Sequence, residues 1–256
     1  MEKSVLFDHI RDSYGFIKRC RGPYLYTSKE VRLVDLYQEG GRAVLGWRAG
    51  KSMLVVKNAL EKGLWGEYCD PSKRRLEQAL KTLFSFCGLQ SFTHFSWYCT
   101  DEILHTDIST SPIPVLYPWS GLSPSGIPPD SEAVFFIPPF PFPSLVIGAS
   151  SSTYSLPVSS PLSSCIMEAL SRALYDLIDA FKERTEGGWA LYDDILSPYF
   201  TRKGSALYPK LSGSEYDEFV LHCLNCGLVL NPSSEYPSFV PHGVHKSLIK
   251  KIDLVK

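Results

Sequence analysis

The sequence predicts a mixed α/β fold of the α+β type, in a single compact unit that spans residues 1–256. Apolar residues recur at helical spacing near both ends of the chain and in one long central segment. Short runs rich in β-branched and aromatic residues, which are typical of strands, lie between them. Residues 91–161 contain 12 of the 19 prolines, and this density excludes long helices and leaves short strands joined by irregular loops.

The first third of the chain predicts helices around a small hairpin. A helix over residues 3–19 has its apolar face at Leu6, Ile10, Tyr14 and Ile17. Two short strands, residues 24–26 and 31–35, flank a turn and form the hairpin. A glycine-rich loop follows, and a short helix from about residue 52 ends near Gly63, which suits a left-handed cap.

The clearest helix start is Asp70-Pro71, because aspartate is a favoured N-cap and proline is tolerated in the first turn. The core positions of this helix are Leu76, Ala79, Leu80, Leu83 and Phe84. Strands are expected at residues 92–98, 133–137 and 144–147, and the longest helix at residues 162–183.

The last third of the chain predicts a mixture of short elements. They are a break at Gly187-Gly188, a short helix at residues 191–196, strands at 200–203 and 206–207, a helix at 214–226, a strand at 227–230 and a final basic helix at 244–254.

Bulk composition excludes several classes of protein. The net charge of −1 gives no reason to expect nucleic acid or an anionic membrane as a partner. The sequence has no run of 18 apolar residues and no apolar leader at its start, so no membrane span is expected. Seven cysteines, an odd number, are typical of reduced thiols, and we expect a cytoplasmic protein.

Lysine is distributed unevenly. Residues 82–181 contain none of the 15 lysines, and Arg172 is the only strong base among eight acids there. Residues 1–81 carry 16 bases and 10 acids, which suggests contact between a basic first third and an acidic middle.

Three segments resemble the small domain of fold-type-I pyridoxal-phosphate enzymes, in particular the class III aminotransferases. Residues 31–47, VRLVDLYQEGGRAVLGW, are similar to the passage in which a second hairpin strand ends in an aspartate before a glycine-rich turn. Residues 161–169, PLSSCIMEA, resemble the start of the helix that follows the catalytic lysine. Residues 218–241 resemble the C-terminal helix, glycine-led strand and Pro/Ser turn.

The resemblance implies small-domain-like regions at residues 1–90 and 185–256, and a reduced, proline-rich central sheet region at residues 91–184. About 80 residues lie between Lys81 and Pro161, too few for a seven-stranded sheet at ordinary element lengths. A Schiff base needs an amine that can lose its proton, which arginine cannot supply. The resemblance therefore implies a shortened, degenerate relative with no catalytic residue and no expected cofactor.

Tyr37, Arg42 and Trp47 are the candidate ligand-binding residues, because the matching segment of the resembled family approaches the substrate. They have the chemistry to hold an anion or an aromatic group. Plain packing of all three side chains is the alternative interpretation.

Other motifs favour structural roles, and no metal site is expected. Cys223 and Cys226 form a single CxxC at a helix C-terminus, where the helix dipole disfavours a thiolate. His242 and His245 are a weak metal signal by themselves. The neighbouring Asp193-Asp194 point about 100° apart on a helix and do not share a proton readily.

These observations lead to two main hypotheses. The first is a non-catalytic, aminotransferase-like protein that acts by binding or association, as a homodimer or with another protein. The alternative is a reduced pyridoxal-phosphate-dependent transaminase that uses a lysine outside residues 82–181; a weaker third is non-covalent binding of the cofactor or an amino acid. The aromatic middle could form either a contact surface or a core, through Tyr98, Tyr117, Trp119, Phe135, Phe136, Phe140 and Phe142.

Overall fold

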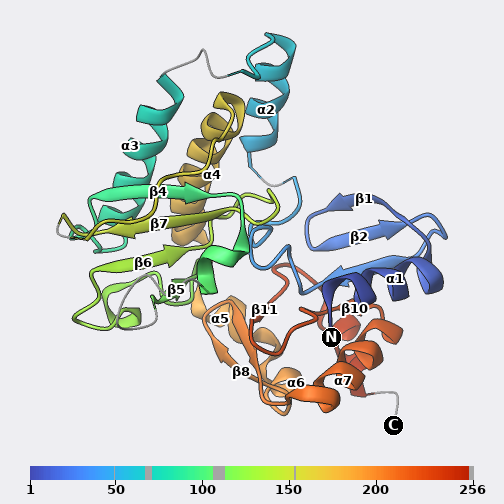
Figure 1. Cartoon of the computed structure of the whole chain (residues 1–256). Coiled ribbons are helices and arrows are strands. Elements are labelled where there is room, and N and C mark those ends of the chain that lie inside the picture. The colour runs from blue at the N-terminus through green and yellow to red at the C-terminus, as the bar shows by residue number, and fades with distance from the viewer. Residues whose placement is uncertain (49, 67–70, 106–112, 153, 254–256) are drawn as a thin grey trace. The chain divides into compact units, whose positions relative to one another are not determined.

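The computed structural model describes residues 1–48, 50–66, 71–105, 113–152 and 154–253 (Figure 1). The chain forms two compact units. The first comprises Met1–Arg48 and Arg184–Lys256, and the second comprises Ala49–Glu183. Residues 49–90 lie in the second unit.

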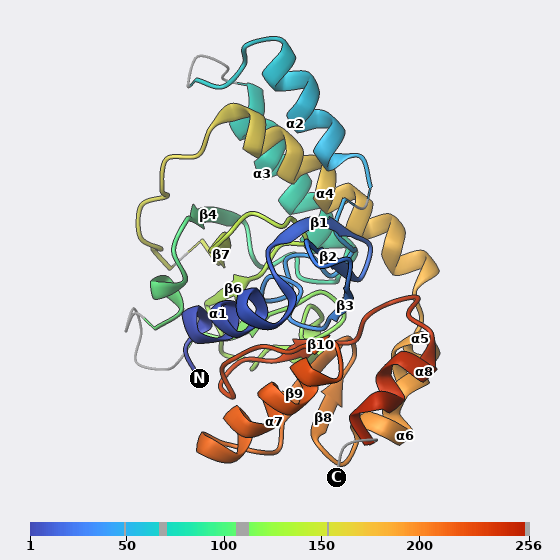
Figure 2. The same ribbon diagram turned by 90° about the vertical axis from the view of Figure 1, so that its right-hand side faces the viewer.

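The first unit is built on a four-stranded sheet with the order β1-β2-β3-β10. Its strands are β1 (Ile17–Arg21), β2 (Tyr24–Thr27), β3 (Arg32–Asp35) and β10 (Leu228–Val229). The first three strands pair antiparallel, and β10 pairs with β3 in parallel. Figures 1 and 2 show helix α1 (Lys3–Tyr14) lying along this sheet.

Helix α1 is shorter than the predicted helix over residues 3–19, and its end is a correction to that prediction. Gly15 has a φ of 79°, a left-handed conformation that ends the helix at Tyr14. Ile17, predicted on the helical face, instead begins β1 and pairs with Thr27 of β2. The helical spacing of apolar residues cannot predict this pairing, because the partner strand lies elsewhere in the sequence.

The remainder of the first unit combines a three-stranded sheet, of order β11-β9-β8, with short helices. Its elements are α5 (Glu186–Trp189), η3 (Ala190–Tyr192), α6 (Asp193–Leu196), β8 (Phe200–Lys203), β9 (Ala206–Pro209), α7 (Gly213–Asn225), β11 (Ser238–Phe239), α8 (Lys246–Ile249) and η4 (Lys250–Asp253). The expected break at Gly187-Gly188 is instead the interior of α5. Large side chains fill this core, among them Trp189, Tyr192 and Tyr216.

The second unit packs three helices with a four-stranded sheet of order β4-β7-β6-β5 (Figure 1). Its elements are α2 (Ser52–Glu61), α3 (Pro71–Phe86), β4 (His94–Tyr98), η1 (Asp101–His105), β5 (Val115–Leu116), η2 (Pro124–Gly126), β6 (Ala133–Phe136), β7 (Val146–Ser150) and α4 (Ser164–Glu183). The ring of Phe84 on α3 meets Phe95 of β4 and Phe136 of β6 edge-on, which joins the helices to the sheet.

Helices α2 and α3 belong with the second unit because both pack on α4. The predicted core positions of α3 are all buried, which confirms its amphipathic face. The proposed N-cap, Asp70, lies outside the described residues.

The aromatic middle of the chain forms mainly core. Five of the seven aromatic residues weighed as core or contact surface are buried: Tyr98, Tyr117, Phe135, Phe136 and Phe140. Trp119 and Phe142 are half-buried. The structure therefore favours the packing interpretation for most of this segment.

A substitution at Gly41 tests the packing of the first unit. Gly41 has a φ of 92°, and a Cβ atom there would lie 2.6 Å from Cζ of Phe239. Gly243 has a φ of 79°, and a Cβ atom added to it would have no neighbour within 4 Å, so it isolates the backbone cost. We expect Gly243→Ala to cost about 1–2 kcal/mol and Gly41→Ala to cost about 1–3 kcal/mol more, as measured by urea unfolding. Equal costs for the two variants would contradict this packing.

Candidate functional site: an acidic, aromatic pocket in the first unit

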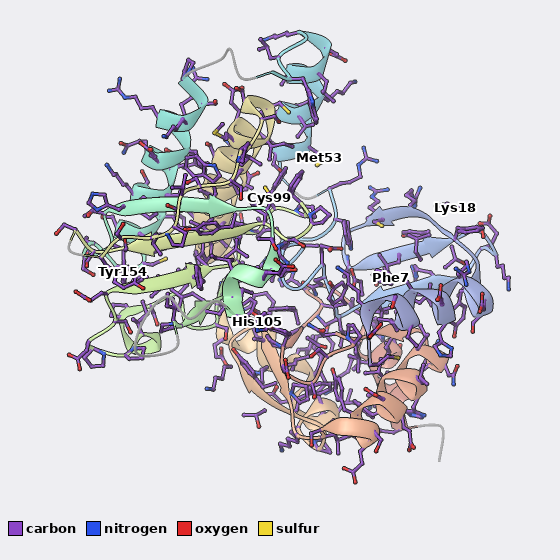
Figure 3. The ribbon with its side chains drawn as sticks, viewed as in Figure 1. Phe7, Lys18, Met53, Cys99, His105 and Tyr154 are labelled. Atoms are coloured by element: carbon purple, nitrogen blue, oxygen red, sulfur yellow. The ribbon has the colours of Figure 1, made fainter. Side chains whose placement is uncertain are left out.

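A cavity of about 410 Å³ lies between α1 and the β1-β2-β3-β10 sheet of the first unit. Its apolar walls are formed by Phe7, Ile10, Phe16, Ile17, Leu25 and Val229. Figure 3 labels Phe7, which α1 contributes to this wall. Asp35, Tyr37 and Trp47 also line the cavity, so it has both apolar and polar surfaces.

The end of β3 positions the polar part of this pocket. Asp35 is the last residue of β3, and its Oδ1 accepts a hydrogen bond of 2.8 Å from the backbone N–H of Gln38. Its Oδ2 accepts a hydrogen bond of 2.6 Å from the indole Nε1 of Trp47. Trp47 is fixed in turn by paired backbone hydrogen bonds with Gly22, in the turn between β1 and β2. One carboxylate therefore joins the turn after β3 to the loop that carries Trp47.

Asp35 is the electrostatic centre of the site. Its side chain is only 1% exposed, and burial raises the pKa of its carboxyl to about 6. The hydrogen bonds from Gln38 and Trp47 oppose this rise, whereas the nearby charge of Glu39 adds to it. Within the described residues Asp35 forms no ion pair, so no protein cation offsets the loss of hydration.

Cys20 also lines the pocket but is held as a neutral thiol. Burial raises the pKa of Cys20 to about 11, and the charges of Asp35 and Glu39 act in the same direction. Since the thiolate is the nucleophilic form of cysteine, the pocket does not activate Cys20.

Lys3 and Tyr37 form a polar pair at the edge of the pocket. The Lys3 ammonium lies 5.3 Å from the centre of the Tyr37 ring and 3.2 Å from Oε1 of Glu39. Burial lowers the pKa of Lys3, but its contacts with Tyr37 and Glu39 raise that pKa overall. Burial also raises the pKa of the Tyr37 hydroxyl. Lys3 is thus kept protonated.

The structure brings together two of the three predicted binding residues. Tyr37 and Trp47 both line the cavity, whereas Arg42 does not. Arg42 is buried, and its guanidinium Nη1 donates a hydrogen bond of 3.3 Å to the backbone oxygen of Glu39. Its environment matches the packing interpretation, with the guanidinium helping to hold the turn after β3.

Asp35 and Cys20 line the pocket but are not among the residues predicted from the sequence to bind a ligand. Asp35 could have been singled out because it lies within the apolar run Leu33-Val34-Asp35-Leu36. Such a run predicts a buried strand, and charged residues are rarely buried unless they are paired. The contribution of α1 had no local signal, because only tertiary packing places Phe7 and Ile10 against the sheet.

The adjacent residues Asp193 and Asp194 form ion pairs within the fold. Asp193 accepts two hydrogen bonds from the guanidinium of Arg202, at 2.7 and 2.9 Å, and the neighbouring Asp194 pairs with Lys246 at 2.7 Å. The two aspartates therefore have separate partners.

The cysteines and histidines near the C-terminus also have ordinary contacts. Cys223 is fully buried, and burial raises the pKa of its thiol. Cys226 donates to the backbone oxygen of Lys251 at 3.2 Å. His245 accepts a hydrogen bond from the backbone of Ser247 and caps α8, while His242 packs against the ring of Trp189. Across the described residues, no three His, Cys, Asp or Glu side chains gather as a metal site.

The lysines bear directly on cofactor chemistry. Every lysine in the described part of the chain is exposed, except Lys246, which is half-buried and paired with Asp194. A lysine becomes a neutral amine near pH 7 when burial lowers its pKa.

Among the described residues, no helix has both the length and the apolarity to cross a membrane.

Comparison of the sequence with known proteins finds two uncharacterized relatives. No family model matches the chain. An uncharacterized protein of Treponema pallidum (strain Nichols) is 25% identical over 279 residues, covering 89% of each chain. An uncharacterized protein of Borreliella burgdorferi is 34% identical over 77 residues, which is 30% of this chain and 29% of that protein.

Solved structures of similar fold are aminotransferases. An acetylornithine aminotransferase from Elizabethkingia anophelis has a TM-score of 0.62 at 10% identity, covering 99% of both chains. An omega-transaminase from Sphaerobacter thermophilus has a TM-score of 0.63 at 11% identity, covering 98% of this chain and 95% of that one. A transaminase with pyridoxal phosphate bound has a TM-score of 0.67 at 8% identity and the same coverage. The chain therefore has a mixed α/β, aminotransferase-like fold, which confirms the fold that the resemblance implied.

The pH dependence of stability tests the burial of Asp35. Its folded-state pKa of about 6 exceeds the ordinary value of 3.8, so its contribution to stability is full below pH 3.8 and is lost as pH rises through about 6. Relative to Asp35→Asn, which does not titrate, the wild type should lose up to about 3 kcal/mol of unfolding free energy between about pH 4 and pH 7. Urea unfolding of both proteins across this range measures the difference. A difference that stays constant with pH would contradict the buried carboxyl.

Proposed function

We propose that this chain is a non-catalytic protein, a shortened and degenerate relative of the aminotransferases that acts by binding. The observation that carries the proposal is the environment of the lysines. None of those described is buried, and Lys3, which contacts the pocket residues Tyr37 and Glu39, has a raised pKa.

The described residues do not fit pyridoxal phosphate held as an imine. An imine forms from a neutral amine, and Lys3 is kept charged by Tyr37 and Glu39. The second unit has six lysines, which are Lys51, Lys57, Lys62, Lys73, Lys81 and Lys182, and all of them are exposed. The sheet of that unit has four strands, all of them short.

The pocket of the first unit supports a binding role. Its volume of about 410 Å³ lies within the range of small-molecule sites, and its walls combine aromatic side chains with a few polar groups. Two of the candidate residues from the sequence, Tyr37 and Trp47, line it. We assign the ligand-binding role to these two residues and to Asp35, and a positioning role to Arg42.

Association of two copies is a second form of the proposal, and α2 favours it. Helix α2 and the turn after it expose a set of large apolar side chains, namely Met53, Leu54, Leu60, Leu64 and Trp65. Figure 3 labels Met53 on this helix. Isolated exposed apolar residues are ordinary, but a cluster on one element is typical of an interface.

Light scattering tests the association. We expect a mass of two chains, and we expect Leu60→Asp to return the protein to a single chain because a carboxylate cannot be buried in an apolar interface. Lys57→Asp, an exposed polar position on the same helix, is the control for added charge. A wild-type protein that stays monomeric at high concentration would remove this form of the proposal.

Incubation with pyridoxal phosphate tests the absence of catalysis. The expected result is no absorbance band of a bound imine, and only scattered, substoichiometric lysine labelling after borohydride reduction, because exposed lysines react unselectively. Peptide mapping by mass spectrometry locates any label. Stoichiometric reduction onto a single lysine would instead support the alternative, a reduced transaminase-type enzyme that uses a lysine outside residues 82–181.

A further inference from the structure

The charge of the pocket lining points to the kind of ligand that it takes. The charged residues that line it are Asp8, Arg11, Asp35 and Glu39, three acids and one base. Arg11 contacts Asp8 at 2.7 Å and Asp12 at 3.2 Å, and Lys3 contacts Glu39 at 3.2 Å. Asp35 is then the lining acid that has no ion pair within the described residues. The balance of charge facing the cavity is therefore negative.

Hydrogen-bonding capacity shows the same bias. The indole N–H of Trp47 is donated to Asp35, and the Lys3 ammonium is engaged with Glu39. The two carboxylates keep lone pairs for further donors, because a carboxylate has about four acceptor sites. A ligand that brings hydrogen-bond donors can therefore use these lone pairs.

The Asp35 carboxylate supplies the strongest attraction. It is buried, and within the described chain it has hydrogen-bond donors but no cation. A buried charge without a counter-ion is costly, and an ammonium group placed beside it would offset that cost. Among the described residues the carboxylate interacts with the backbone N–H groups of Tyr37 and Gln38, the indole of Trp47, the charge of Glu39 and the neutral thiol of Cys20, none of which is positively charged.

Three apolar residues that line the pocket are exposed. Phe7, Phe16 and Ile17 are 44%, 70% and 37% exposed. A ligand with an apolar body would cover these side chains and gain from their removal from water. The rings of Tyr37 and Trp47 add favourable faces for a cation.

From these observations we propose that the pocket binds an organic amine, with its protonated nitrogen at Asp35 and Glu39 and its apolar body against Phe7, Phe16 and Ile17. This inference rests on the proposed binding function and names its ligand class. The nitrogen must carry hydrogens, since the carboxylates accept hydrogen bonds.

A charge series on one ring system tests the proposal. Tryptamine, indole-3-ethanol and indole-3-propionate share the indole and differ in the end group, and phenethylamine with 2-phenylethanol repeats the comparison on a smaller ring. Calorimetric titration of the whole protein at about pH 7.5 should show each amine binding at least about tenfold more tightly than its alcohol. The acid should bind more weakly than the alcohol. If neither amine exceeds its alcohol, the proposal is overturned.

Variants connect this preference to the named carboxylates. Glu39→Gln removes a rim charge without altering the hydrogen bonds of Asp35, and it should reduce amine affinity about threefold or more while leaving alcohol affinity unchanged. Glu218→Gln, the same change at an exposed position on α7, is the matched control and should leave both affinities unchanged. Equal effects of the two variants would contradict the assignment.

Asp35→Asn should abolish the preference for amine over alcohol. Because Asp35 also holds the turn after β3, circular dichroism must show that this variant folds; if it does not, lowering the pH of the wild type makes the same test. Protonation of Asp35 below about pH 6 should weaken amine binding and spare the alcohol. The other titratable residues that line the cavity are Asp8, Arg11, Cys20, Tyr37 and Glu39, and Lys3 lies beside Tyr37 and Glu39. An amine preference that is unchanged at about pH 4.5 would overturn the role of Asp35.

Failure of this inference and failure of the proposed function have different readouts. The first is an affinity ratio near one in protein without added pyridoxal phosphate. The second is a covalent mass on a single lysine after borohydride reduction.

Discussion

The hydrogen bonds of the buried Asp35 carboxylate hold the pocket of the first unit together. One oxygen accepts from the backbone of Gln38 and fixes the turn after β3, where Gln38 and Glu39 both have a positive φ. The other oxygen accepts from Trp47, whose backbone pairs with Gly22. A single side chain thereby sets the positions of Tyr37, Glu39 and Trp47, and helix α1 closes the cavity over them.

Burying the Asp35 carboxylate without a counter-ion costs hydration free energy, a cost that two other acids of the same unit avoid. Asp193 is balanced by the guanidinium of Arg202, and Asp194 by Lys246, whereas Asp35 has only neutral donors in the described chain. The aminotransferase-like fold thus contains a buried negative charge at the edge of its small sheet, and no buried amine among the described lysines. The buried negative charge is the feature on which the proposed amine ligand depends.

Local sequence patterns were sufficient to predict the helices and strands whose apolar residues recur at a regular spacing. The apolar stripes of α3 and α4 predicted long helices, and the residues of β2 and β3 predicted their hairpin. Ile17 was placed in a helix because its spacing fits one, and only the positive φ of Gly15 and pairing with β2 make it a strand residue. The two-residue strand β5 left no pattern to detect, because it pairs with β6 across intervening loops. Tyr37 and Trp47 were found by resemblance, but the role of Asp35 depends on contacts 12 residues apart in sequence.

The carboxylate of Asp35, which has no counter-ion among the described residues, lines the pocket, and we propose that it accepts a cation from the ligand. Carbon-13 nuclear magnetic resonance of the Asp35 carboxyl, titrated with pH in the free protein and with saturating tryptamine, measures this most directly. We expect a pKa near 6 in the free protein that falls when the amine binds, because the ammonium favours the charged form. A pKa near the ordinary value of 3.8 that does not change with the amine would contradict it.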